Sequence, residues 1–151
     1  MPAFSILRAC LRDDRGTALI ETAVVAPVLI VLAIGTFETS SMVARQSELQ
    51  SAAEQAVEIA LATAPDTQAE LNAIKAKVEE STGLNDARVQ IKFQYRCGAA
   101  TTVSDVAPSC SEDALNTYFA LAISDEYQPT WTNWGFGQSI EYAVNRTVQV
   151  S

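Results

Sequence analysis

The chain has few types of side chain that could do chemistry: its 151 residues include three cysteines and 18 acidic residues but no histidine. Without histidine, Ser-His-Asp and Cys-His catalysis, His-containing zinc sites and haem with histidine ligation are excluded. No Walker-type glycine loop, Cys-x-x-Cys motif or nucleophile elbow occurs. The net charge of −8 argues against nucleic acid as a partner, because binding phosphates requires basic side chains. We therefore expect a protein that is not an enzyme and that has no cofactor, metal ion or nucleic-acid partner.

Glu21 is the acidic residue with the most unusual surroundings. It is the only charged residue between residues 17 and 37, a run of apolar and small side chains with Pro27 inside it. As a helix, this run would be roughly 31 Å long, close to the hydrocarbon thickness of a bilayer. A carboxylate in such a helix is costly unless a partner neutralises it. The element that must position Glu21 is therefore a transmembrane helix over residues 17–37.

The charges on either side of this segment predict its orientation. Residues 1–16 have a net charge of +1, and residues 17–151 have a net charge of −9. The positive-inside rule then places the N-terminus in the cytoplasm and the bulk of the chain outside. A cleaved secretory signal is less favoured, because residues 33–35 offer no convincing cleavage site. A buried helix of a soluble protein is also less favoured, because apolar side chains cover every face.

The string RGTALIETAVVAPVLIVLAIGTFE resembles the N-terminus of the TadE-like family, the minor pilins or pseudopilins of the tight-adherence pilus. The shared features are a short polar leader ending in Arg-Gly, a small residue after it, a glutamate at the fifth position and a later proline. The resemblance implies that residues 1–16 are a leader and that prepilin peptidase cleaves between Gly16 and Thr17. Glu21 would then be the fifth mature residue, and Pro27 would kink the helix. Thr22 departs from the aromatic residue that many relatives carry.

The resemblance also implies a function, a location and partners. The protein would take part in the assembly, initiation or anchoring of a tight-adherence type IV pilus. It would cross the bacterial inner membrane once, with its C-terminal domain in the periplasm; incorporation into the pilus itself is left open. Its partners would be prepilin peptidase, other minor pilins and pilus or inner-membrane assembly components. Glu21 would pair with the Thr17 ammonium of a neighbouring subunit and so fix the axial stagger.

Two alternatives to this function stay open. One is a pseudopilin of the type II secretion kind, which shares the glycine and the fifth-position glutamate but usually lacks the proline. The other is an uncleaved, single-pass anchor that displays a periplasmic binding domain. The N-terminus of the membrane-extracted protein distinguishes a cleaved pilin from an uncleaved anchor.

The helix is expected to continue beyond the membrane over residues 38–62, which contain no glycine or proline. One narrow apolar stripe on this continuation consists of Leu49, Ala53, Ala56 and Ala60. Their spacing is that of one helix face. We expect the stripe to pack on the protein's own domain, with contact to neighbouring subunits as the alternative.

A second, shorter helix is predicted over residues 68–81. Pro65 breaks the first helix, and Thr67 and Glu70 have the spacing of a capping box, in which each side chain bonds the other residue's backbone amide. Gly83 supplies a stop signal. This helix opens the small domain expected over residues 63–151.

The remainder of that domain alternates apolar and polar side chains with the period of a β-strand. The cleanest strand spans residues 88–97, and two further candidates span residues 117–127 and 139–150. Strands of this kind favour an antiparallel sheet with one face covered by helices. The fold class is therefore α+β and pilin-like, with a long N-terminal helix, a second helix and three antiparallel strands.

The three cysteines divide between the two sides of the membrane. Cys10 lies in the leader, on the reducing cytoplasmic side, whereas Cys97 and Cys110 lie outside. An oxidising periplasm would link the outer pair in a disulfide. Closing a loop of this length would stabilise the domain by roughly 3 kcal/mol. A metal site is less favoured, because two isolated cysteines supply too few ligands.

Three aromatic side chains cluster late in the chain, in the sequence TWTNWGFG. We expect Trp131, Trp134 and Phe136 to fold over the domain's minor core. The alternative is a sugar-stacking or adhesive platform.

Overall fold

The computed structural model describes residues 14–110 and 114–151, with side chains from Ala18 onward. Most of the expected leader, including Cys10, lies outside the described residues. The described elements are α2 (Asp14–Thr63), α3 (Gln68–Thr82), β1 (Val89–Cys97), β2 (Leu115–Tyr127), the 3-10 helix η2 (Thr130–Trp134) and β3 (Ile140–Gln149). The chain divides into two compact units, Met1–Ser41 and Met42–Ser151. Helix α2 begins in the first unit and ends in the second.

Helix α2 has 50 residues and includes the expected continuation after the apolar run. In the second unit its buried face is the predicted stripe. The four side chains of that face, each at most 1 % exposed, are Leu49, Ala53, Ala56 and Ala60. They belong to one hydrophobic core with side chains of α3 and of all three strands. The stripe therefore packs on the protein's own domain, as expected.

Helix α3 begins and ends at the predicted signals. The Thr67 hydroxyl accepts a hydrogen bond from the Glu70 amide, and the Glu70 carboxylate accepts one from the Thr67 amide. These reciprocal bonds form the capping box and satisfy two amides of the first turn. Gly83 ends the helix with a φ of 69°, in the left-handed region that glycine tolerates best. The apolar face of α3 is buried through Leu71, Ile74 and Val78.

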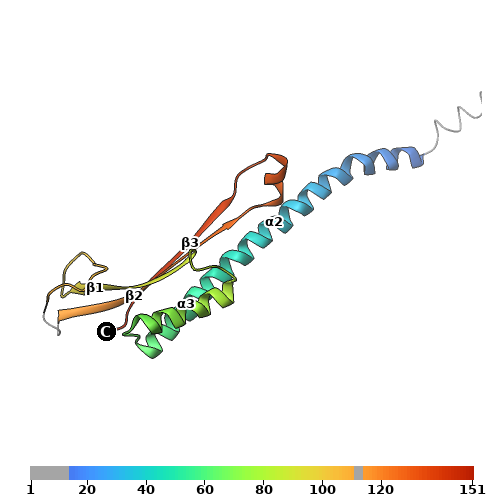
Figure 1. The fold of residues 1–151 in the computed structure, drawn as a ribbon. Coiled ribbons are helices and arrows are strands. Elements are labelled where there is room, and N and C mark those ends of the chain that lie inside the picture. Colours follow the sequence, from blue (N-terminus) through green and yellow to red (C-terminus); the bar gives the residue numbers. More distant parts are fainter. Residues whose placement is uncertain (1–13, 111–113) are drawn as a thin grey trace, which may run out of the picture. The chain divides into compact units, whose positions relative to one another are not determined.

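The three strands form one antiparallel sheet in the order β1-β2-β3, as the alternation predicted. The register aligns Phe93 of β1 with Phe119 of β2 and Val148 of β3, so these side chains share one face. That face contributes to the hydrophobic core with α3 and the second-unit part of α2. Figure 1 shows these helices on one side of the sheet. The α+β prediction is confirmed.

Strands β2 and β3 continue beyond the end of β1 as a two-stranded hairpin. Strand β1 pairs with β2 only as far as Ile123, whereas β2 and β3 pair up to Tyr127 and Ile140. At the tip, the side chains of Trp134 and Phe136 are 64 % and 69 % exposed. The expectation that they fold over a minor core is wrong. The hairpin carries them past the end of the three-stranded part of the sheet.

Candidate functional site

The N-terminal part of α2 presents apolar side chains on every face. The exposed large apolar side chains of the first unit are Leu19, Ile20, Val24, Val25, Val28, Leu29, Ile30, Val31, Leu32, Ile34 and Phe37. The helix that contains them is long and apolar enough to cross a membrane. Exposing so much apolar surface to water is unfavourable, because its burial is the main favourable contribution to folding and association. Such a surface is consistent with a membrane anchor.

Glu21 lies on the surface of this apolar helix. Beside it is a hollow of about 240 Å³ lined by Glu21, Thr22, Val25, Ala26 and Leu29. The hollow exists because Thr22 and Ala26 are short side chains between longer ones. Among the residues whose side chains are described, Glu21 has no hydrogen-bond or ion-pair partner. An unpaired carboxylate next to a hollow is an arrangement that a neighbouring helix can fill and neutralise.

The described hydroxyl groups of residues 18–37 donate to backbone carbonyls of the same helix. The hydroxyl of Thr22 donates to the Ala18 carbonyl over 2.8 Å, and that of Thr36 donates to the Ala33 carbonyl over 2.9 Å. Bonds of this kind hide the polarity of threonine from an apolar environment. Among the described side chains of residues 18–37, Glu21 is therefore the polar group left without a partner.

Pro27 lies inside α2, where it lacks the amide hydrogen that would bond to the fourth residue before it. The expected kink there stays a prediction. Gly16 and Thr17 lie in the first turns of α2, and their side chains are outside the description. Cleavage between them also stays a prediction.

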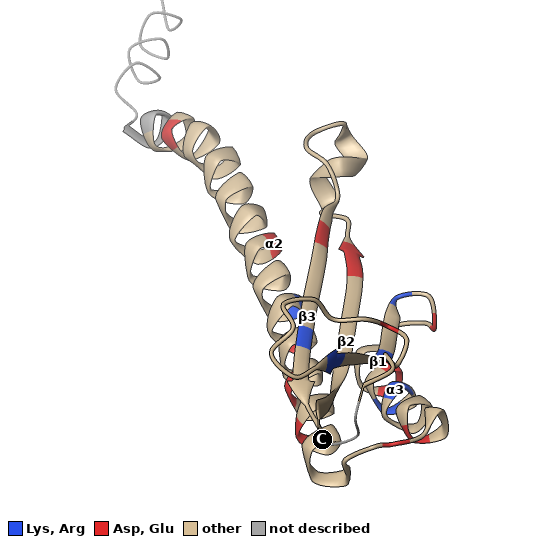
Figure 2. Ribbon diagram, turned by 90° about the vertical axis from the view of Figure 1, so that its left-hand side faces the viewer, with Lys and Arg blue, Asp and Glu red and all other residues tan. Residues whose placement is uncertain are grey.

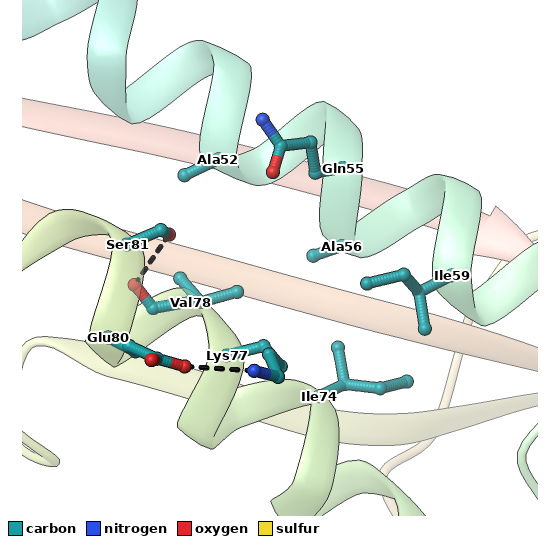
Figure 3. A pocket seen from close by; sticks show the side chains of 9 residues that line it. All are labelled: Ala52, Gln55, Ala56, Ile59, Ile74, Lys77, Val78, Glu80 and Ser81. Carbon is teal, nitrogen blue, oxygen red and sulfur yellow. Dashed lines mark hydrogen bonds and ion pairs between the residues drawn. The ribbon is translucent and has the colours of Figure 1, made fainter.

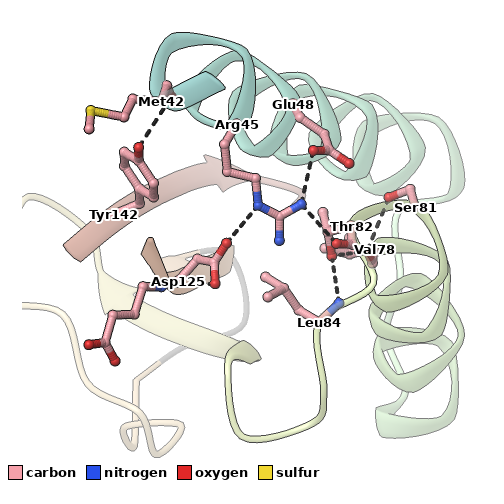
Figure 4. Close-up of polar contacts among 10 residues, drawn as sticks. Met42, Arg45, Glu48, Val78, Ser81, Thr82, Leu84, Asp125 and Tyr142 are labelled. Carbon is pink, nitrogen blue, oxygen red and sulfur yellow. Dashed lines mark hydrogen bonds and ion pairs between the residues drawn. The ribbon is translucent and has the colours of Figure 1, made fainter. Parts of the chain in front are cut away.

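In the second unit, a polar cluster around Arg45 joins three elements (Figure 4). The guanidinium of Arg45 on α2 donates to Asp125 of β2 over 2.6 Å and to Glu48 over 2.9 Å. It also donates to the carbonyl of Thr82, the last residue of α3, over 3.0 Å. A cation at a helix C-terminus is favourable, because the last carbonyls carry partial negative charge. Burial disfavours the charge of Arg45, but these bonds outweigh it and raise its pKa.

Tyr142 of β3 adds a second bond between the sheet and α2. Its hydroxyl donates to the carbonyl of Met42 over 3.2 Å. Burial raises the pKa of Tyr142, and the Asp125 carboxylate raises it further, against the opposite effect of Arg45. The hydroxyl therefore stays protonated and remains a donor. The sheet is fixed to α2 at the residue where the helix enters the second unit.

Sequence reasoning missed this cluster. Arg45 and Asp125 are 80 residues apart, so no local pattern connects them. One signal was available: Arg45 is the only basic residue between residues 17 and 74. A lone cation on a helix rich in acidic neighbours indicates a specific partner.

A narrow groove of about 230 Å³ runs between α2 and α3 (Figure 3). Its apolar wall consists of Ala52, Ala56, Ile59, Ile74 and Val78. The side chains of Lys77 and Glu80 lie on the α3 side and pair with each other over 2.9 Å. The groove arises because two alanines of α2 leave space beside the longer side chains of α3.

The predicted disulfide between Cys97 and Cys110 is confirmed, with 6.2 Å between the two Cα atoms. The loop that it closes returns to the edge of β1, where Tyr95 and Ser104 exchange two backbone hydrogen bonds of 2.8 and 2.9 Å. Asp105 in the same loop bonds to Lys92, which lowers the pKa of that carboxyl. The disulfide thus fastens a loop that also pairs with the sheet.

Within residues 14–110 and 114–151, no three side chains of the metal-binding types gather closely enough to hold a metal ion. What the described geometry defines is a class of protein: a small α+β domain carried by a long apolar N-terminal helix.

Residues 16–58 match the family model described as TadE-like protein. The match covers less than a third of the chain and includes Glu21, Pro27 and the start of the buried stripe. Over this segment the chain is similar to the TadE-like family, which is associated with assembly of the tight-adherence pilus. The resemblance inferred from the sequence is confirmed. Neither a curated protein nor a solved structure matches the chain.

Proposed function

We propose that this protein is a minor pilin or pseudopilin that helps to assemble, initiate or anchor a tight-adherence pilus. Residues 1–16 are its leader, residues 17–37 cross the inner membrane once, and the remainder lies in the periplasm. Prepilin peptidase removes the leader by cleaving between Gly16 and Thr17. The other partners are related minor pilins and components of the pilus or its inner-membrane machinery.

The observation that carries the proposal is an apolar helical segment, residues 19–37, with exposed apolar side chains and one carboxylate, Glu21, within the part that matches the family. An apolar surface on every face suits a helix that moves from lipid into a bundle of like helices, since both surroundings are apolar. Glu21 then needs a cationic partner inside that bundle. Cleavage after Gly16 creates one, because it leaves an ammonium group on Thr17.

The second unit suits a domain that transmits position rather than one that performs catalysis. Arg45 and Tyr142 fix the sheet to α2 where the helix enters the unit. A shift of the helix along its axis would therefore carry the sheet with it. In an assembly built by stacking helices, such a connection sets where each domain is presented.

The mature N-terminus tests the proposal. We expect mass spectrometry of the membrane-extracted protein to find a chain that starts at Thr17. Gly16→Ala should abolish this cleavage, and Ser5→Ala in the same leader is the matched control that should leave it unchanged. An intact N-terminus in the wild-type protein would contradict the proposal and favour the uncleaved anchor. Cleavage with co-purification of secretion components would favour the type II secretion pseudopilin.

A further inference from the structure

The tip of the β2–β3 hairpin is the largest exposed aromatic feature of the second unit. Trp134 and Phe136 are its exposed large apolar side chains. Residues 127–140 contain no Asp, Glu, Lys or Arg, and the end of the hairpin is accordingly free of red and blue in Figure 2. The acidic residues Glu126 and Glu141 lie immediately before and after this stretch. An uncharged aromatic tip above an acidic base is unlike the rest of this acidic domain.

The tip is ordered by its own contacts. Within it, the amide of Phe136 donates to the Trp131 carbonyl over 3.2 Å, and the amide of Gly135 donates to the Thr132 carbonyl over 3.1 Å. A side-chain carbon added at Gly137 would lie 3.1 Å from the Trp131 indole nitrogen, so that ring packs against the Gly137 backbone. Because these two amides already have partners, moving them into a medium that contains little water costs less.

The tip lies at the end of the second unit where α2 enters it. Tyr142 bonds to Met42, the first residue of the unit, whereas Leu49, two turns further along α2, is in the core. Moving along the helix from Leu49 to Met42 therefore leads from the core toward the hairpin. Beyond Tyr142, β3 continues for two more residues to Ile140, about 7 Å of strand, before the tip begins.

The lipid headgroup layer is within reach of such a tip. Met42 is five residues beyond residue 37, the end of the proposed membrane span, which corresponds to about 7.5 Å of helix. The headgroup layer on each side of the hydrocarbon is itself roughly 5 to 7 Å thick. Tryptophan is enriched in this layer, because its indole combines a large apolar ring with one hydrogen-bond donor.

We propose that Trp134 and Phe136 insert into the headgroup layer of the membrane that the chain's own N-terminal helix crosses. The inference rests on the proposed membrane anchor and adds a second contact with the same bilayer. With one point of attachment, a domain on a single helix is free to tilt. With two, the domain is held at a defined angle before the helix enters an assembly. Because the tip is uncharged, the contact requires no anionic lipid.

Tryptophan fluorescence tests this contact directly, because the chain's two tryptophans, Trp131 and Trp134, are both in the tip. The full chain is placed in nanodiscs of plain phosphatidylcholine, or of phosphatidylcholine brominated either near the headgroup or near the end of the acyl chains. Bromine quenches only nearby indoles. We expect a loss of fluorescence with headgroup-proximal bromine and a smaller loss with bromine at the chain ends.

Single-tryptophan variants locate the contact. Trp131→Phe leaves only the exposed Trp134 and should keep the quenching, whereas Trp134→Phe leaves only the packed Trp131 and should reduce it. Phe136→Ser should weaken the quenching of Trp134. The matched control is Val106→Ser, an equally exposed apolar residue of the disulfide loop, 76 % exposed, which should leave the quenching unchanged.

Co-elution of the chain with the nanodiscs is measured separately from quenching. A chain that co-elutes but shows equal fluorescence in plain and brominated discs overturns the tip contact and leaves the membrane anchor intact. Such a result would favour a soluble glycan or a second protein as the occupant of the tip. A chain that fails to co-elute contradicts the anchor, and the tip contact with it.

Discussion

Arg45 and Asp125 are 80 residues apart in the chain, yet the Nε of Arg45 donates to the Oδ2 of Asp125 over 2.6 Å. Their side chains are 24 % and 16 % exposed, so the pair is only partly accessible to water. It joins α2 to β2 next to the bond between Tyr142 and Met42. Both contacts connect the helix to the projecting part of the hairpin.

We expect Asp125→Asn to lower the free energy of unfolding by about 1.5 to 3 kcal/mol, because it removes a charge-assisted bond and leaves a half-buried cation poorly compensated. Chemical denaturation of the full chain in detergent, followed by circular dichroism, measures the loss. Glu48→Gln is the matched control: it removes the more exposed partner of the same Arg45, and we expect a loss of only about 0.2 to 1 kcal/mol. Equal losses in both variants would show that Asp125 has no special part in the joint.

The disulfide between Cys97 and Cys110 should stabilise the second unit by roughly 3 kcal/mol. We expect the double variant Cys97→Ser, Cys110→Ser to lose this free energy of unfolding and therefore to unfold at a lower denaturant concentration. It should still fold, because Tyr95 and Ser104 keep their backbone bonds. Treating the wild-type protein with a reductant should reproduce the shift, and the double variant should not respond to it. A reductant that leaves the wild-type midpoint unchanged would count against the prediction.

The capping box of α3 predicts a pH dependence of stability. Backbone bonds from Asp66, with further bonds from Thr67, lower the pKa of Glu70 below its ordinary value. The unfolded chain therefore binds this proton at a higher pH than the folded chain does. The contribution of Glu70 is complete above its ordinary pKa in the unfolded chain and is lost as the pH falls through the lower folded value.

Thermal unfolding measured between neutral and acidic pH tests this dependence. Glu70→Gln should reduce the fall of the melting temperature between neutral and acidic pH. Glu58→Gln, which changes an exposed acidic residue of α2, should leave that fall unchanged. Thr67→Ala removes the hydroxyl from the cap and should cost about 1 kcal/mol at neutral pH. A Glu70→Gln curve parallel to that of the wild-type protein would contradict the assignment.

The comparison of these contacts shows what can be predicted from the sequence. The ends of α3 were predictable, because Thr67, Glu70 and Gly83 act on backbone groups within one turn. The strands were predictable from their alternation. The pairing of Arg45 with Asp125 was not, because it depends on which elements meet in space. The exposure of Trp134 was not either, since apolarity favours burial and only the relative lengths of β1 and β2 place that residue beyond the sheet.

The same limit applies to the N-terminal helix, where the proposed partner of Glu21 would belong to another chain. We expect Glu21→Ala to leave membrane insertion and leader cleavage unchanged and to reduce the amount of partner subunits that co-purify with the protein from cross-linked membranes. Glu21→Gln should behave in the same way, because it keeps the size of the side chain and removes the charge that would meet an ammonium group. Glu58→Ala, on the exposed side of α2 in the second unit, should co-purify partners at wild-type levels. Wild-type recovery of partners with both Glu21 variants would refute the pairing, whereas recovery with Glu21→Gln alone would assign Glu21 to a packing contact.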